Sequence, residues 1–359
     1  YMKKYSFMIA LCVALLMGDM QPLPVSQAAS RQEMAAIQVV QAKDFRYWTA
    51  DSPVKAALVQ YVEKVIDRKS PDFIPAADRV AVFDMDGTLM CETAPSYFDS
   101  LLYQKRVLDD GSWQPSADMR AAAVESRSAL QQKRHSRMGE EEEEAYQMNA
   151  FDGMPLSEYR TYVKKFMQEP EQGLTHLKRG EAFYLPMVEV VSYLAANDFK
   201  VYIVSACDRM AVRLLVDGVL PIEPEHIIGS DAWVRASNQG DASGVDYVYG
   251  KNDVLVRGKY LQETVAMNKV SAIAREIGRQ PVLAFGNSGG DASMLNYTIQ
   301  NNKYKSASFV LLCDDLEREF GNLKKAQKVK ASAEKNGWIP VSMKDEFKTI
   351  YGDRVKKVR

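Results

Sequence analysis

The stretch from residue 79 to residue 89 constrains the fold of this chain more than any other part of it. It contains an apolar run, Val80 to Phe83, which stops abruptly at two carboxylates, Asp84 and Asp86, and a glycine, Gly87. A short apolar run bounded by polar and glycine residues predicts a buried parallel strand. Because ligands of open α/β sheets bind at the carboxyl ends of such strands, we expect the two acids at a functional site.

The spacing of these two acids suggests that they divide the chemistry between them. Like charges this close raise a pKa unless a cation neutralises them, and Mg²⁺ prefers oxygen ligands. Asp84 is suited to attack phosphorus as a nucleophile, and Asp86 to protonate the leaving group and then activate water. The alternative is a strand end capped by exposed aspartates before a turn, since short motifs also arise by chance.

Three further elements follow downstream, each after an apolar strand pattern or at the start of a helix. Ser205 ends the strand pattern 199–204, and Lys269 opens an amphipathic helix that runs to about Ile277. The strand pattern 281–285 leads into a glycine-rich turn that carries Asn287 and Asp291. Taken with the pattern Asp-x-Asp-Gly-Thr at 84–88, this order resembles the phosphatases of the haloacid dehalogenase (HAD) superfamily.

The resemblance implies a role for each of these residues. Ser205 and Lys269 would hold the phosphoryl oxygens. The magnesium site would consist of Asp84, the backbone carbonyl of Asp86, and Asn287, with Asp291 behind them holding a metal-bound water or Lys269. The family usually has aspartate where this chain has Asn287, so the site loses one negative charge; we expect this change to affect metal affinity more than reaction type.

The likeness extends beyond the motifs. Residues 70–75, 151–154 and 337–344 are similar to a bacterial subgroup related to phosphoserine phosphatase. This subgroup implies an α/β fold: a Rossmann-like, doubly wound parallel sheet with a helical cap inserted after the first catalytic strand and a small β flap. It also implies small phosphomonoester substrates, similar to phosphoserine or phosphocholine.

The length of chain between the first two motifs predicts the cap. A plain strand–helix–strand crossover needs a few tens of residues, far fewer than separate Asp84 from Ser205. We therefore expect an HAD core at 30–94 and 187–359 and a helical cap at 95–186. The cap should contain helices at 97–107, 117–132, 140–148 and 156–168. A helix at 54–66 and another at 187–196 should belong to the core.

Two later segments predict smaller features. Alternating residues at 245–249 and 254–256 around a Gly-Lys-Asn-Asp turn predict the hairpin of a β flap. The pattern 308–312 predicts the final strand, which ends at Asp314 and Asp315. These acids either support the site or cap a helix, and helix capping is favoured.

The N-terminus has the pattern of a secretory signal peptide. Lys3 and Lys4 precede an apolar stretch at 7–17, and small residues follow at 28–30. The apolar stretch is shorter than the roughly 20 residues of a membrane span. We predict a signal peptide at 1–29 and a periplasmic or secreted bacterial protein, with an N-terminal anchor as the alternative.

The net charge and the placement of the histidines argue against two other classes of protein, those that bind nucleic acid and those that bind zinc. The formal net charge is −1, which provides no electrostatic footprint for nucleic acid. The chain has three histidines, His135, His176 and His226, without ligand spacing, so we expect no zinc site.

Several residues near the motifs have two interpretations. Cys91 and Cys207 each follow a catalytic strand, so they are either buried free thiols or an oxidised pair. Glu92 could meet a substrate amine or lie on the surface. The acidic run 140–144 favours a solvated helix face. Eight cap aromatics favour core packing over a cage for a quaternary ammonium: Tyr97, Phe98, Tyr103, Trp113, Tyr146, Phe151, Tyr159 and Tyr162.

Together these patterns predict a Mg²⁺-dependent phosphatase that acts through an aspartyl phosphate. Superfamily dehalogenases lack the second aspartate and the ATPases have threonine there, so Asp86 favours ester hydrolysis. The alternatives are a phosphotransferase to alcohol acceptors, which uses the same residues, and a non-catalytic protein that binds a phosphorylated ligand, which only Asn287 favours.

Overall fold

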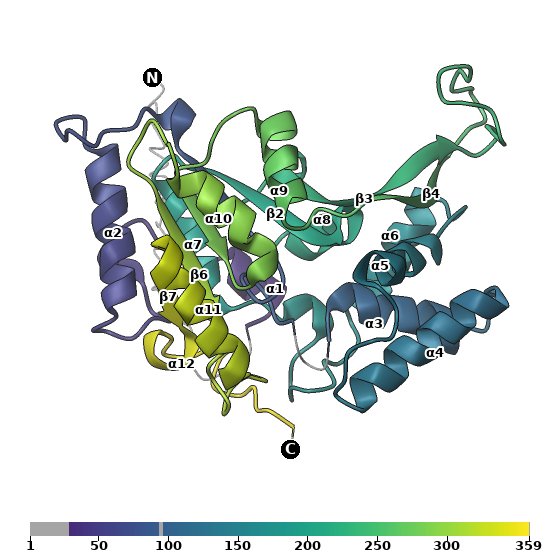
Figure 1. Ribbon diagram of the computed structural model, residues 1–359, viewed down its shortest axis with the longest axis horizontal. Coiled ribbons are helices and arrows are strands. Elements are labelled where there is room, and N and C mark those ends of the chain that lie inside the picture. Colours follow the sequence, from purple (N-terminus) through teal and green to yellow (C-terminus); the bar gives the residue numbers. More distant parts are fainter. Residues whose placement is uncertain (1–28, 93–95, 359) are drawn as a thin grey trace, which may run out of the picture.

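The computed structural model describes residues 29–92 and 96–358 (Figure 1). The predicted signal peptide at 1–29 lies outside these residues except for Ala29. None of the helices within the described ranges has the length and apolar character needed to cross a membrane.

A seven-stranded sheet forms the centre of the molecule, in the order β4-β3-β2-β1-β5-β6-β7. All neighbouring strands are parallel except β4, which runs antiparallel to β3. The predicted α/β class, with a doubly wound parallel sheet, is confirmed. The strands are β1 Val80–Phe83, β2 Lys200–Asp208, β3 Ile227–Ala236, β4 Leu255–Gln262, β5 Leu283–Gly286, β6 Ala307–Leu312 and β7 Ile339–Ser342.

Strand β1 is apolar throughout because helices cover both faces of the sheet. Ala81 and Phe83 belong to one buried cluster, and Val80 and Val82 belong to the other. A strand buried on both faces shows a continuous apolar run rather than alternation. Phe83 stacks on Phe285 of β5, with ring centroids 4.3 Å apart, which aligns the ends of the two strands.

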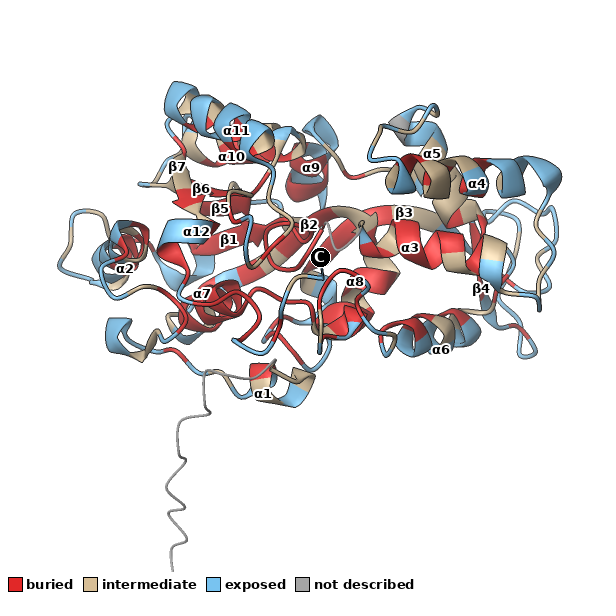
Figure 2. Cartoon of the chain, turned by 90° about the horizontal axis from the view of Figure 1, so that it is seen from below, coloured by how far each residue is buried: buried red, intermediate tan, exposed pale blue. Residues whose placement is uncertain are grey.

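The core helices divide between the two faces of the sheet (Figure 2). One face packs against α2, α7 and α8, and the other against α9, α10 and α11. The predicted helices at 54–66 and 187–196 correspond to α2 and α7 within two residues. The bounds are α1 Arg31–Ala35, α2 Pro53–Ile66, α7 Leu185–Ala196, α8 Arg209–Val216, α9 Met267–Ala272, α10 Ala292–Ile299, α11 Leu323–Asn336 and α12 Met343–Glu346.

Four helices between β1 and β2 gather beside the outer end of β4 (Figure 1). Their bounds agree with the predicted helices to within three residues, although the first continues as a π-helical turn over Lys105–Asp109. They cover the edge of the sheet, because Arg257 of β4 donates to the Met154 carbonyl and accepts from the Gly153 N–H. The helices are α3 Phe98–Gln104, α4 Ala117–Gln131, α5 Glu140–Asn149 and α6 Leu156–Phe166.

The predicted flap strand at 245–249 is wrong. The hairpin is formed by β3 and β4 themselves, and residues 237–254 connect them. Val245 and Val248 are about nine-tenths exposed, so this segment has no face to bury as a strand. Asp253 organises the connection instead, since its carboxylate accepts hydrogen bonds from the Gly250 and Asn238 N–H groups.

The strand predicted to be the last is followed by another. β7 pairs with β6 at the edge of the sheet and contains Pro340. Proline lacks the N–H that a ladder needs and is tolerated in edge strands, which is why the pattern did not predict β7.

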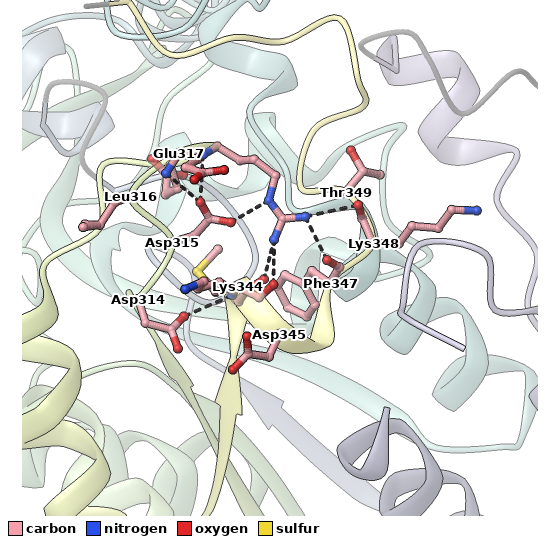
Figure 3. A network of polar contacts seen from close by, with 12 residues as sticks. Asp314, Asp315, Leu316, Glu317, Lys344, Asp345, Phe347, Lys348 and Thr349 are labelled. Carbon is pink, nitrogen blue, oxygen red and sulfur yellow. Dashed lines mark hydrogen bonds and ion pairs between the residues drawn. The ribbon is translucent and has the colours of Figure 1, made fainter. Parts of the chain in front are cut away.

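The acids after β6 stabilise the chain around α12 (Figure 3). Asp314 accepts hydrogen bonds from the Ser342 hydroxyl and the Lys344 N–H at the start of α12, which agrees with the predicted capping role. Asp315 instead accepts from the Arg318 guanidinium at 2.5 Å, and Arg318 also donates to the Phe347 carbonyl at 2.8 Å. Neither acid lines the cavity described below.

Glu189 of α7 is a buried acid whose protonation links the stability of the core to pH. It is 1% exposed and accepts hydrogen bonds from the Arg46 and Tyr47 N–H groups. Burial raises the pKa of Glu189 to about 7, against the lowering effect of those two bonds. The folded protein therefore binds more protons than the unfolded chain at intermediate pH, so stability from this group is present at low pH and is lost as pH rises towards 7.

We expect Glu189→Gln to remove this pH dependence. The free energy of unfolding of the native chain, relative to the variant, should fall by about 3 kcal/mol between pH 4.5 and pH 7. Urea unfolding at both pH values measures the difference. Glu63→Gln, on the exposed face of α2, is the matched control, and an equal pH slope in all three proteins would contradict the prediction.

Candidate active site

A cavity of about 510 Å³ lies at the carboxyl ends of the central strands, between the core and α3, α4 and α5. The register of the sheet creates it, because Phe83 pairs with Ile203 on one side and with Phe285 on the other. The residues that follow these three positions therefore share one edge. All six residues predicted for the site line the cavity: Asp84, Asp86, Ser205, Lys269, Asn287 and Asp291.

Lys269 links two of the acids. It lies in the first turn of α9, is 1% exposed, and places its Nζ 2.6 Å from Asp84 Oδ1 and 2.7 Å from Asp291 Oδ1. Burial lowers the pKa of Lys269, but the carboxylates of Asp291 and Asp84 outweigh it and the net shift is upward. The ammonium therefore stays charged beside the predicted nucleophile.

Both acids of the first motif resist ionisation. Burial, reinforced by Asp291, raises the pKa of Asp84 to about 7 despite the opposing effect of Lys269. Burial also raises the pKa of Asp86 well above its ordinary value, although the Cys207 thiol donates a hydrogen bond to Asp86 Oδ2. Asp86 Oδ1 is buried and has no hydrogen-bond partner among the described residues. A protonated Asp86 is thus suited to donate a proton to a group bound in the cavity.

The serine of the second motif is oriented by the end of its own strand, because Ser205 and Cys207 both lie in β2. Ser205 is 1% exposed, and its Oγ accepts a hydrogen bond from the Cys207 N–H at 3.1 Å. This bond leaves the hydroxyl proton of Ser205 available to an oxygen in the cavity.

Asp291 organises the turn that follows β5. Its Oδ2 accepts hydrogen bonds from the Asn287 and Ser288 N–H groups, at 2.9 and 3.1 Å, while its Oδ1 accepts from Lys269. Gly286 permits this approach, because a Cβ there would lie 2.6 Å from the Asp291 Cβ. With both oxygens engaged, Asp291 is placed to position Lys269 and the turn rather than to contact a metal directly.

Glu92 is not on the surface: it lines the cavity, and each of its carboxylate oxygens contacts a side chain of the protein. It is 5% exposed, with Oε2 3.0 Å from Asn287 Nδ2 and Oε1 2.5 Å from Lys325 Nζ of α11. Gly87 makes room for both side chains, since a Cβ there would lie 1.9 Å from Asn287 Nδ2 and 2.9 Å from the Glu92 carboxyl carbon. Its φ of +74° also favours glycine.

The oxygen atoms of this site suit a magnesium ion. No group of three or more His, Cys, Asp and Glu side chains in the described ranges is arranged to hold a metal. The predicted ligands include only one such side chain, Asp84, with the Asp86 carbonyl and the Asn287 amide oxygen. Such hard donors suit Mg²⁺, which commonly binds through one or two carboxylates and retains waters. A cation here would also offset the raised pKa of Asp84.

The cap supplies further acids to the cavity. Glu143 and Glu144 of α5 line it, so the acidic run is a solvated face only in part, with Glu141 and Glu142 exposed. Burial, together with Asp99, raises the pKa of Glu144 well above its ordinary value. Of the eight cap aromatics, only Tyr97 lines the cavity, which leaves too few rings for the alternative of an aromatic cage.

The end of β2 also holds the cap. Asp208 ends β2, and its N–H donates to Asp99 of α3 at 2.7 Å. Its carboxylate pairs with Arg257 of β4 at 2.5 Å and accepts from the Tyr159 hydroxyl of α6 at 3.0 Å. The end of β2, which carries Ser205, is therefore joined to α3, α6 and β4.

Within the described residues, Cys91 and Cys207 are not joined by a disulfide. Cys207 bonds to Asp86, whereas Cys91 lies 3.8 Å from Glu319 Oε1. Each thiol donates to the carboxylate of a different residue, so the structure agrees with the first interpretation, two thiols, rather than with an oxidised pair.

Sequence reasoning missed two contacts of the site. The thiol bond to Asp86 had a signal, because Cys207 lies two residues beyond the Ser205 motif. Lys325 had none, since it comes from a helix more than two hundred residues after Glu92 and belongs to no motif.

Comparisons with known proteins give likenesses to solved structures, all of low sequence identity among those described here. A search of the curated proteins found no match. A conserved protein of unknown function from Anaerococcus prevotii is 14% identical, with a TM-score of 0.48, over 80% of this chain and 91% of that one. Cytosolic 5′-nucleotidase IIIB bound to cytidine is 13% identical, with a TM-score of 0.43, over 77% and 84% of the two chains.

A phosphoserine phosphohydrolase-like protein from Francisella tularensis is 13% identical, with a TM-score of 0.36, over 65% of this chain and 87% of that one. At these TM-scores the likenesses do not bear on function.

The family comparison is decisive. The sequence profile of the haloacid dehalogenase-like hydrolases matches residues 81–296, which is well over half of the chain. The matched range begins within β1 and ends within α10, so it contains all four motifs and the cap between them. The chain therefore belongs to the haloacid dehalogenase-like hydrolases, the family that its motifs predicted.

Proposed function

We propose that this hydrolase is a magnesium-dependent phosphatase that cleaves small phosphomonoesters through an aspartyl phosphate. One observation carries the proposal: two buried acids at the end of β1 differ in their surroundings. Asp84 is paired with the Lys269 ammonium at 2.6 Å, whereas Asp86 accepts only the Cys207 thiol bond and has one oxygen without a partner among the described residues. Groups arranged in this way suit a nucleophile beside a general acid.

The first half-reaction follows from this arrangement. A carboxylate oxygen of Asp84 attacks phosphorus as the bond from phosphorus to the ester oxygen breaks. Asp86 transfers its proton to the departing alkoxide, which leaves as an alcohol. The Ser205 hydroxyl and the Lys269 ammonium bind the phosphoryl oxygens. Bound Mg²⁺ would neutralise phosphoryl charge and favour ionised Asp84.

In the second half-reaction Asp86, now a carboxylate, accepts a proton from water as the water oxygen attacks phosphorus. The bond from phosphorus to Asp84 breaks, inorganic phosphate leaves, and both acids return to their starting states. Asp291 acts throughout by holding Lys269 and the turn that carries Asn287. Catalysis of this kind consists mainly of positioning and charge neutralisation.

The cavity size supports a small substrate. About 510 Å³ accommodates a metabolite-sized phosphomonoester, and the cap helices that line it would select among such compounds. Compounds similar to phosphoserine or phosphocholine are the first to test.

The activity can be tested by phosphate release from a panel of phosphomonoesters with and without Mg²⁺. We expect magnesium-dependent release concentrated on one or two compounds. Asp84→Asn should reduce turnover to background without a change in fold, because the amide cannot form the phosphoenzyme. Turnover by Asp84→Asn at the native rate would refute the mechanism.

The molecule that accepts the phosphoryl group distinguishes a phosphatase from a phosphotransferase: it is water in the first case and an alcohol in the second. With added alcohols in the assay, we expect inorganic phosphate to remain the main product, because Asp86 is placed to activate water. Quantitative analysis of the products by phosphorus NMR measures the ratio. A new phosphate ester as the main product would identify a phosphotransferase.

Lys269→Met should destabilise the fold in metal-free solution. The substitution leaves the carboxylates of Asp84 and Asp291 buried without their cation, which we expect to cost about 3–5 kcal/mol. Lys259→Met, at an exposed position of β4, is the matched control. Urea unfolding in the presence of a chelator measures both, and equal effects of the two substitutions would show that Lys269 has no such role.

A further inference from the structure

We infer that Glu92 is a positioning residue for the metal site: it orients the Asn287 amide so that its oxygen, rather than its nitrogen, is available to the cation. The inference rests on the proposed magnesium-dependent function and identifies how this chain uses an amide as a ligand. It concerns the contact between Glu92 and Asn287. Glu92 itself belongs to none of the motifs.

An amide ligand poses a problem that a carboxylate does not. Either oxygen of an aspartate can bind a cation, whereas Asn287 presents an oxygen on one arm of its planar amide and an NH₂ group on the other. Only the oxygen can be a ligand of Mg²⁺. A site that uses asparagine therefore needs a second group that distinguishes the two arms.

Glu92 supplies this distinction. Its carboxylate only accepts hydrogen bonds, and its Oε2 lies 3.0 Å from Asn287 Nδ2. If the amide were rotated by 180°, its oxygen would face a carboxylate oxygen and the two would repel. The charge-assisted bond therefore keeps NH₂ towards Glu92 and leaves the oxygen arm for the cation. Residues behind a metal ligand commonly fix its orientation in this way.

Two neighbours hold Glu92 in place. Lys325 of α11 pairs with Glu92 Oε1 at 2.5 Å, so the buried carboxylate is compensated and its two oxygens have separate partners. Gly87 leaves space for the contact, since a side chain there would overlap both Asn287 and Glu92.

The pairing also accounts for asparagine at this position. An aspartate at residue 287 would place a second carboxylate against Glu92 at hydrogen-bond distance, where like charges repel. Asn287 and Glu92 thus form a matched pair, in which each residue type suits the other.

The test measures Mn²⁺ affinity, with the electron paramagnetic resonance signal of the free ion as the readout, independent of turnover. Glu92→Gln should weaken binding by about 10-fold or more, because one amide oxygen must serve both Asn287 and Lys325. Glu92→Asp keeps the charge but shortens the side chain, so it should weaken binding to a similar extent. Native affinity in Glu92→Asp would show that Glu92 contributes only charge, and would overturn the inference.

The Asn287→Asp background provides the decisive comparison. An aspartate needs no orientation, so Glu92→Gln in that background should change Mn²⁺ affinity by less than about 2-fold or should strengthen it. An equal loss in both backgrounds would mean that Glu92 acts independently of Asn287, and would also overturn the inference. Such a double-mutant cycle isolates the coupling between the two residues.

Two controls separate this inference from the proposed function. Glu143→Gln removes one charge from the same cavity at a residue outside the Glu92–Asn287 pair, and should leave Mn²⁺ affinity within about 2-fold. Thermal unfolding in a chelator checks that each variant is folded. If the native protein binds no Mn²⁺, the proposed metal dependence and this inference both fail. If it binds Mn²⁺ but Glu92→Gln and Glu92→Asp have no effect, the inference alone fails.

Discussion

The ion pairs of Lys269 are the interaction on which the rest of the site depends. One buried ammonium joins the carboxylate at the end of β1 to the carboxylate in the turn after β5. Without the cation, two negative charges would be buried side by side, which is costly in a region of low dielectric constant. The pairing therefore brings α9, the β1 loop and the β5 turn to the same place, and it leaves Asp86 outside the network with a free oxygen.

A second network extends this arrangement. Asn287 connects the β5 turn to Glu92, and Glu92 connects it to Lys325 of α11. On the other side, Asp208 joins the end of β2, which carries Ser205, to Arg257 of β4 and to Asp99 of the cap. Asn287, Glu92, Asp208 and Arg257 are buried, whereas Lys325 and Asp99 are partly buried, and buried polar groups are stable only when they are paired. The pairing requirement thus contributes to how the cap, β4 and the core fit together.

Much of the fold could be predicted because its signals are local. The apolar run before Asp84 and the helical spacing at 117–132 and 156–168 depend on near neighbours along the chain, and the structure has a strand and helices there, with ends that differ by at most two residues. The strand predicted at 245–249 failed because alternation alone does not show whether a face will be covered, and Val245 and Val248 remain exposed. Strand β7 was missed because Pro340 suggests that pairing stops, whereas an edge strand tolerates it.

The sequence by itself determined the order of the four motifs, their positions at strand ends and helix starts, and hence the family. Strand ends meet at one edge in any parallel sheet, so that part required no tertiary information. Only the tertiary structure decided the partners of the polar side chains. Glu92 pairs with Lys325, Asp86 accepts a hydrogen bond from Cys207, and Glu144 lines the cavity. Such partners come from segments far apart in the chain, and burial selects among them by the cost of leaving a polar group unpaired.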